Sequence, residues 1–200
     1  PKPEHLAALS QSAAYFSIGV PFENVWLDRI AEANPEMRIV DTAAGIERVP
    51  IEAHSHEAGA DEDHSDDEGD DHDHAEGAPD PHIWLSPSLV KVQARRIAEA
   101  LIDLDPDRQA TYEANLDAFL ADIEDLEETI EKALRGIESR KFLVFHPSWG
   151  YFAEDFGLEQ IAIEVGGQEP SARELAELIA LAQEEEIRVV FAQPDRKSVV

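Results

Sequence analysis

Residues 51–87 read IEAHSHEAGADEDHSDDEGDDHDHAEGAPDPHIWLSP, and this stretch separates two parts of ordinary α/β sequence. Acidic and histidine residues alternate with small residues, and large apolar side chains are absent between Ile51 and Ile83. A segment of this composition cannot bury enough apolar surface to offset the entropy that it would lose on ordering. We therefore predict an acidic mobile loop inserted into a folded α/β protein.

The loop carries five histidines, with H-x-H pairs at both ends. They are His54, His56, His64, His72 and His74. Imidazoles among carboxylates favour borderline cations such as Zn²⁺. Ordering flexible ligands costs roughly 1–2 kcal/mol per residue, so we predict weak metal capture with variable stoichiometry. The alternative is a solvated linker whose histidines reflect composition alone.

Composition excludes several classes of protein. The 200 residues carry a formal charge of −28, and 13 of the 44 acidic residues lie between Glu52 and Asp80. This acidity argues against nucleic-acid binding, which needs Lys and Arg patches. The absence of cysteine excludes thiolate zinc sites, iron–sulfur clusters and disulfides. No apolar run reaches the roughly 18 residues that predict a transmembrane helix.

Before the loop, apolar periodicity predicts a helix, a strand, a second helix and a second strand. Their expected ranges are 3–11, 14–18, 21–33 and 37–41. Strand, helix and strand with short connections indicate a parallel βαβ arrangement.

After the loop, Ser86-Pro87 is expected to start a helix that ends before Pro106. Apolar residues then recur every three or four positions from Tyr112 to Ile137, which predicts one helix of roughly 45 Å. A helix this long is more typical of a strut than of a simple crossover. Further strands at 142–146, 161–163 and 187–192 alternate with short helices and indicate a second α/β unit.

These elements predict three parts. They are a partial N-terminal α/β lobe at 1–105 with the acidic loop at 51–80, a linking helix at 106–138, and a partial C-terminal α/β lobe at 139–200.

Two histidines outside the loop are candidate metal ligands. His82 lies where the acidic loop meets the fold, and His146 follows an apolar strand. Ligands of open α/β sheets bind beyond the carboxyl ends of the strands, which favours a role for His146. Two histidines do not complete a four-donor zinc site. Position alone does not distinguish metal ligands from structural histidines near the strand ends.

Three motifs resemble one family. Residues 80–87 (DPHIWLSP) resemble the D-P-H-x-W-x-x-P signature of the cluster A-I, or cluster 9, metal-binding proteins of ABC importers. Residues 142–152 (FLVFHPSWGYF) resemble the second signature of that family, and residues 191–194 (FAQP) resemble a third. The opening PKP is similar to the tail of the first signature. The resemblance covers essentially the whole chain.

The resemblance implies two parallel-sheet α/β lobes joined by a long rigid helix, with one metal in the cleft between the lobes. It implies that His82 and His146 are two ligands of that metal. In the manganese branch the position of His146 is usually a glutamate, whereas a histidine and an acidic His-rich loop resemble the zinc, ZnuA-like branch. Imidazole suits Zn²⁺ and an added carboxylate suits Mn²⁺, so Zn²⁺ is expected.

The resemblance also implies the surroundings of the protein. We expect a monomeric receptor in the periplasm, or anchored outside the cytoplasmic membrane as a lipoprotein, with an ABC permease and its ATPase as partners. The remaining ligands are expected upstream of Pro1 and beyond Val200.

Two other functions are alternatives to a transport receptor. A metallohydrolase is disfavoured because the sequence holds no H-E-x-x-H motif and no nucleophile elbow, so we predict no enzyme. A periplasmic zinc buffer would use the loop histidines alone. Trp84 and Trp149 are expected to pack as core beside the site, and Glu23 is expected to be a plain residue of a helix N-terminus.

Overall fold

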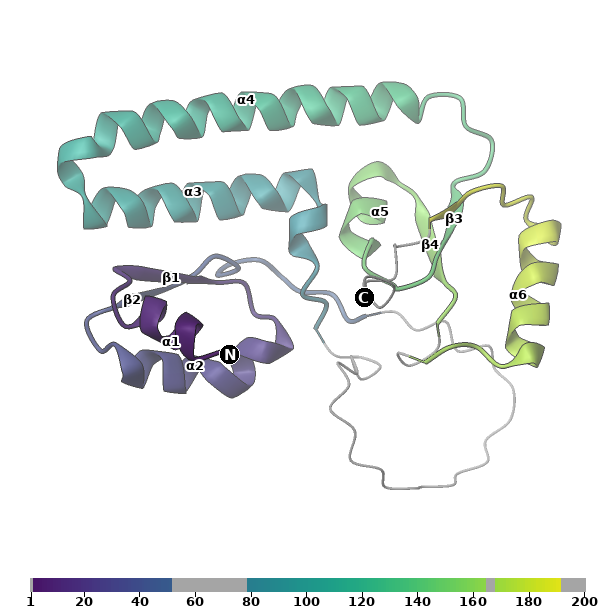
Figure 1. Ribbon diagram of the computed structural model, residues 1–200. Coiled ribbons are helices and arrows are strands. Elements are labelled where there is room, and N and C mark those ends of the chain that lie inside the picture. Colours follow the sequence, from purple (N-terminus) through teal and green to yellow (C-terminus); the bar gives the residue numbers. More distant parts are fainter. Residues whose placement is uncertain (1, 52–78, 165–167, 192–200) are drawn as a thin grey trace. The chain divides into compact units, whose positions relative to one another are not determined.

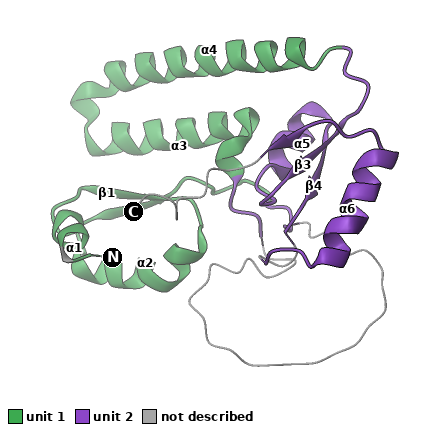
Figure 2. Ribbon diagram, turned by 45° about the vertical axis from the view of Figure 1, so that its right-hand side comes forward, with its two compact units in different colours: residues 1–47, 83–135 green, residues 48–82, 136–200 purple. Residues whose placement is uncertain are grey.

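The structure, a computed structural model, describes residues 2–51, 79–164 and 168–191. It is an α/β fold whose strands pair in parallel, as the sequence predicts (Figure 1). The chain divides into two compact units, which are described separately: unit 1 comprises residues 1–47 and 83–135, and unit 2 comprises 48–82 and 136–200 (Figure 2). The five loop histidines lie outside the described residues.

Unit 1 starts with a parallel βαβ arrangement. Its elements are α1 (Pro3–Leu9), β1 (Ala14–Ser17), α2 (Pro21–Ala33) and β2 (Arg38–Asp41). The strands pair in the register Ala14↔Arg38 to Ser17↔Asp41, so their carboxyl ends meet at one edge. Helix α2 begins at a proline, whose fixed φ suits the first helical position. It buries Ile30, which is 1% exposed.

Two long helices complete unit 1. After a 3₁₀ turn, η1 (Ile83–Leu85), α3 runs over Pro87–Leu104, and the turn η2 (Pro106–Arg108) leads into α4 (Gln109–Ala133). The two helices lie side by side (Figure 1). Ser86 caps α3, because its hydroxyl accepts a hydrogen bond from the Leu89 N–H at 3.1 Å. Lys91 and Glu127 form an ion pair of 2.7 Å between α3 and α4.

Unit 2 contains a three-stranded parallel sheet. Its elements are β3 (Lys141–Val144), α5 (Gly150–Phe156), β4 (Glu159–Ala162), α6 (Ala172–Glu184) and β5 (Val190–Phe191). The strand order is β4-β3-β5, with Lys141 opposite Glu159 and Val144 opposite Ala162. The segments flanking the acidic loop belong to this unit, and they meet in an antiparallel bridge between Pro50 and Pro79.

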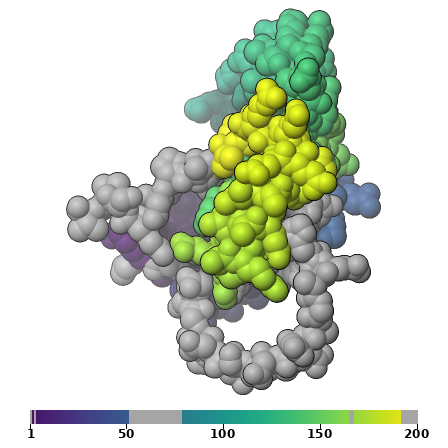
Figure 3. Space-filling model, turned by 90° about the vertical axis from the view of Figure 1, so that its right-hand side faces the viewer, coloured from purple at the N-terminus to yellow at the C-terminus, as the bar shows by residue number. Residues whose placement is uncertain are grey.

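Alternate residues of β3 face opposite sides of the sheet, as the two-residue repeat of a strand requires. Phe142 and Val144 pack with Ala153 of α5, and Leu143 packs with Leu178 of α6. Both faces of the strand are therefore buried, which explains its continuous apolar sequence. Helix α6 lies on the face of unit 2 that Figure 3 turns toward the viewer. Ser171 and Glu174 form a capping box at the start of α6.

Some boundaries differ from the sequence prediction. The long helix ends at Ala133, although apolar spacing continues to Ile137, because Gly136 adopts a φ of +78° that belongs to a turn. Trp84 is 40% exposed, so its assignment to the core was wrong. The compact units also cut the chain at positions other than the two boundaries of the expected three-part division, and that division stays a prediction. None of the described helices is long and apolar enough to cross a membrane.

Candidate metal centre

His82 is held by the aspartate that precedes it by two residues. One carboxylate oxygen of Asp80, Oδ1, accepts a hydrogen bond from the His82 backbone N–H at 2.9 Å and lies 2.6 Å from the ring nitrogen Nδ1. Both side chains are nearly buried, with exposed fractions of 10% for His82 and 3% for Asp80. Because one oxygen binds both the backbone and the ring of His82, this turn fixes where the imidazole points.

Asp80 is itself fixed by its main chain. Its N–H donates to the carbonyl of Val49 at 2.8 Å, and its carbonyl accepts from the hydroxyl of Tyr151 at 2.9 Å. The same hydroxyl accepts from the Val49 N–H at 3.2 Å. Burial raises the pKa of Tyr151, so the phenol stays protonated and able to donate. The two chain segments that flank the acidic loop are thus joined through one buried tyrosine of α5.

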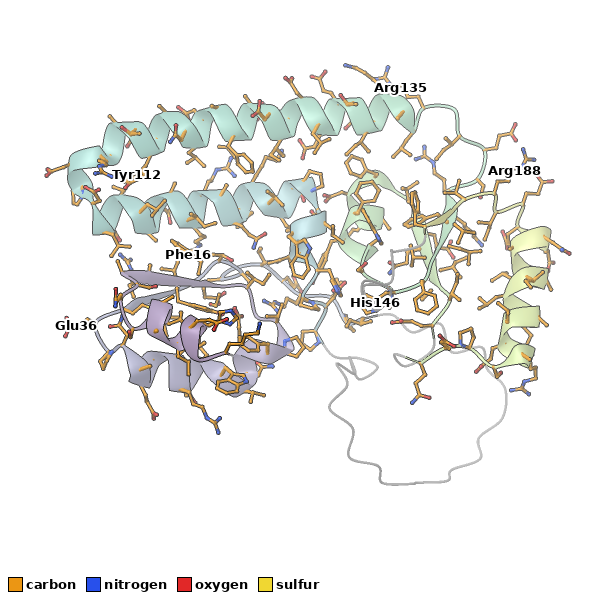
Figure 4. All side chains as sticks on the ribbon, in the orientation of Figure 1. Phe16, Glu36, Tyr112, Arg135, His146 and Arg188 are labelled. Atoms are coloured by element: carbon orange, nitrogen blue, oxygen red, sulfur yellow. The ribbon has the colours of Figure 1, made fainter. Side chains whose placement is uncertain are left out.

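His146 is held by a carboxylate from the neighbouring strand. The ladder between β3 and β4 continues beyond their ends, since Ile163 donates to the Val144 carbonyl at 2.8 Å and Glu164 to the Phe145 carbonyl at 3.1 Å. This register brings Glu164 beside His146, and its Oε1 lies 2.5 Å from the ring Nδ1. The side chains are 27% exposed for His146 and 10% for Glu164. Figure 4 labels the His146 side chain.

The two imidazoles lie against each other within unit 2. Their ring centroids are 5.2 Å apart and their planes cross at 75°. Each therefore has a carboxylate at Nδ1 and the other histidine close by, an arrangement in which metal-binding histidines are commonly found. Within the described ranges, no cluster of three or more His, Cys, Asp or Glu residues can hold a metal ion. A zinc site requires four donors, so the pair by itself does not complete one.

The structure brings His82 and His146 together, as expected of two ligands of one site, and their role as ligands stays a prediction. His5, the remaining histidine of the described residues, is exposed on α1. Trp149 packs against the Phe142 cluster, as expected. Asp80 and Glu164 were not predicted as site residues. A D-x-H spacing could have indicated Asp80, whereas Glu164 depends on strand register and carries no local signal.

Metal-binding histidines commonly have a carboxylate at their second ring nitrogen, and ligands of parallel α/β sheets bind beyond the carboxyl ends of the strands. The fold and the histidine pair together therefore indicate an α/β metal-binding protein. The chain belongs to the family of the zinc-uptake complex component A, periplasmic (ZnuA), whose model matches residues 1–199. This match bears out the family resemblance that the motifs at 80–87 and 142–152 indicated.

Curated relatives agree with the family. The chain is 33% identical over 123 residues to the high-affinity zinc uptake system protein ZnuA of Bacillus subtilis, covering 60% of this chain and 39% of that protein. It is 25% identical over 197 residues to the manganese-binding lipoprotein MntA of Halalkalibacterium halodurans, covering 96% of this chain and 58% of that protein. The chain thus spans about 40–60% of the length of these relatives.

Solved structures share the fold. A crystal structure of ZnuA superposes with a TM-score of 0.79 at 48% identity, covering 96% of this chain and 67% of that one. A ZnuA deletion mutant with zinc bound gives a TM-score of 0.78 at 46% identity, covering 99% of this chain and 69% of that one. The expected fold class, that of the periplasmic metal-binding proteins, is therefore confirmed.

Proposed function

We propose that this chain is part of a zinc-binding solute receptor of an ABC importer. The receptor captures Zn²⁺ outside the cytoplasmic membrane and delivers it to the permease. The observation that carries the proposal is the pair of imidazoles of His82 and His146, 5.2 Å apart, each with Nδ1 on a carboxylate. Membership of the zinc-uptake family supports it.

Zinc is favoured over manganese as the transported ion. Relatives of this chain include proteins named for each metal, so family membership alone does not choose between them. Two neutral imidazoles form a nitrogen-rich donor set, which suits borderline Zn²⁺ better than the harder Mn²⁺. His146, at the position where the manganese branch usually has a glutamate, therefore favours zinc.

The location and partners follow from the same family. Relatives are named as periplasmic components or as metal-binding lipoproteins, which supports a location outside the cytoplasmic membrane, with or without a lipid anchor. The partners are then an ABC permease and its ATPase, and the receptor is expected to act as a monomer that binds and releases metal without turnover. The acidic loop would gather zinc near the site through His54, His56, His64, His72 and His74.

A zinc buffer that acts through the loop alone is the second candidate, favoured by the five histidines of the loop. The deciding experiment is a calorimetric zinc titration of the full mature protein and of a variant in which residues 52–78 are replaced by a short Gly-Ser linker. This replacement keeps Asp80, and Pro50 and Pro79 already pair across its ends. One tight site that survives in the variant supports the receptor. Loss of all zinc binding overturns it in favour of the buffer.

A further inference from the structure

We infer that Asp80 and Glu164 are positioning residues of the candidate metal centre. Each fixes the proton of one imidazole on Nδ1, so that Nε2 of His82 and Nε2 of His146 are the nitrogens that bind the metal. The inference rests on the proposed function for the identity of the metal. It gives a role to two residues, Asp80 at the start of the first motif and Glu164, that were not predicted as site residues.

The position of the proton follows from the contacts. A neutral imidazole has one N–H donor and one nitrogen with a lone pair, and an ionised carboxylate can only accept. With Asp80 Oδ1 at 2.6 Å and Glu164 Oε1 at 2.5 Å, an unprotonated Nδ1 would set two lone pairs against each other. The proton therefore lies on Nδ1 in both rings, and the lone pair lies on Nε2.

The two carboxylates act by different structural routes. Asp80 is local to His82: it closes a turn of two residues, and its main chain is held by Val49 and Tyr151. Glu164 is eighteen residues from His146 and is brought to it by the β3–β4 register. A change at Glu164 therefore alters the ring of His146 without breaking a turn, which makes Glu164 the better residue to test.

Charge is the second contribution of these residues. Two neutral imidazoles carry no charge, so the carboxylates of Asp80 and Glu164 supply two negative charges one ring away from the metal. Their field matches a divalent cation and increases the electron donation of each imidazole. Asp80 and Glu164 thus favour a divalent cation at the two imidazole nitrogens, although neither carboxylate binds the metal directly.

The test compares Glu164→Gln and Glu164→Ala in the full mature protein. Glutamine keeps an oxygen that can accept from Nδ1 but removes the charge, whereas alanine removes both. Glu159→Gln is the matched control, because Glu159 begins β4, the strand that leads to Glu164, and its side chain is 53% exposed and pairs with Lys141. Two quantities are measured: zinc affinity by competition with a chelator, and the His146 tautomer in metal-free protein by ¹H–¹⁵N NMR of the ring.

Glu164→Ala is expected to weaken zinc binding by about 10- to 100-fold and to move the His146 proton off Nδ1 in part of the molecules. Glu164→Gln should fall between Ala and the unaltered protein, and Glu159→Gln should change neither quantity. An unchanged tautomer together with unchanged zinc affinity in Glu164→Ala would overturn the inference. Failure of the unaltered protein to bind zinc would instead overturn the proposed function, since the tautomer is read without metal.

Discussion

The imidazole ring of His82 lies 5.2 Å from that of His146, with the two planes at 75°. His82 ends the segment that follows the acidic loop, and His146 follows β3. The pair therefore forms only when the segment after the loop packs on the sheet of unit 2. The buried Tyr151 makes that packing specific, because its hydroxyl binds both Val49 and Asp80. The geometry of the candidate site is thus a consequence of the fold of one unit.

Removing either histidine is expected to weaken zinc binding by at least about 100-fold, more than the loss of a residue that only orients a ligand. His82→Ala and His146→Ala are the variants, and competition titration with a chelator is the measurement. His5→Ala is the matched control, because His5 is exposed on α1. Equal zinc affinity in all four proteins would show that neither histidine is a ligand.

Replacing residues 52–78 by a Gly-Ser linker is expected to lower the number of bound zinc ions while the tight site is kept. The reason is that flexible ligands lose entropy on binding and so bind weakly, whereas His82 and His146 are already ordered by their carboxylates. Calorimetry gives both stoichiometry and affinity. A lower affinity of the tight site in this variant would mean that the loop contributes ligands to it.

Much of this fold was predictable from apolar periodicity. The helices and strands appear in the predicted order, and both sets of strands are parallel. The end of α4 was missed because the periodicity of its apolar residues continues past the point where Gly136 turns the chain. Trp84 was expected to pack as core beside the site, but it lies in a 3₁₀ turn and is 40% exposed.

The site was predictable only in part. His82 and His146 stand out by residue type and by motif, but their proximity depends on packing between distant segments. Glu164 is a single acid among many in an acidic chain, and only the β3–β4 register identifies it as the partner of His146. Glu23 was interpreted as a plain residue of a helix N-terminus, whereas its side chain is buried and collects several hydrogen bonds.

Glu23→Gln is expected to lower the free energy of unfolding by about 1–3 kcal/mol, because it removes the charge from the acceptor of several part-buried hydrogen bonds. The carboxylate of Glu23 accepts from the backbone N–H groups of the turn that joins β1 to α2 and from the Tyr15 hydroxyl. The N–H donors are those of Ile18, Gly19 and Val20, at 2.6–3.3 Å. In Gln one of the two oxygens becomes an NH₂ group, which cannot accept. Urea unfolding measures the change.

Glu32→Gln is the control, at an exposed site of the same helix, and should change stability by less than about 0.5 kcal/mol. If both substitutions lowered the stability equally, the loss would come from removing one negative charge from the helix, and the hydrogen bonds of Glu23 would not explain it.

Tyr15 is expected to make unfolding easier at alkaline pH. Burial, followed by the nearby charge of Glu23 and the 3.1 Å hydrogen bond to it, raises the pKa of Tyr15 to about 12. In the unfolded chain the phenol ionises near its ordinary value of 10. Below pH 10 both states hold the proton and stability does not depend on it. Between pH 10 and about 12 only the unfolded state loses the proton, so stability falls as pH rises.

Tyr15→Phe removes this proton and should make the decline of stability between pH 10 and 12 smaller, as followed by urea unfolding at several pH values. Part of the decline should remain, because burial also raises the pKa of Tyr151. Tyr112→Phe is the control for loss of a phenol elsewhere, since Tyr112 lies at the start of α4 with its hydroxyl 3.4 Å from Asp105. If Tyr15→Phe kept the full alkaline decline while Tyr112→Phe removed it, the ionisation that matters would lie in α4. Direct absorbance titration near 295 nm gives an independent check, because Tyr15 should ionise in the folded protein only near pH 12, before or together with unfolding.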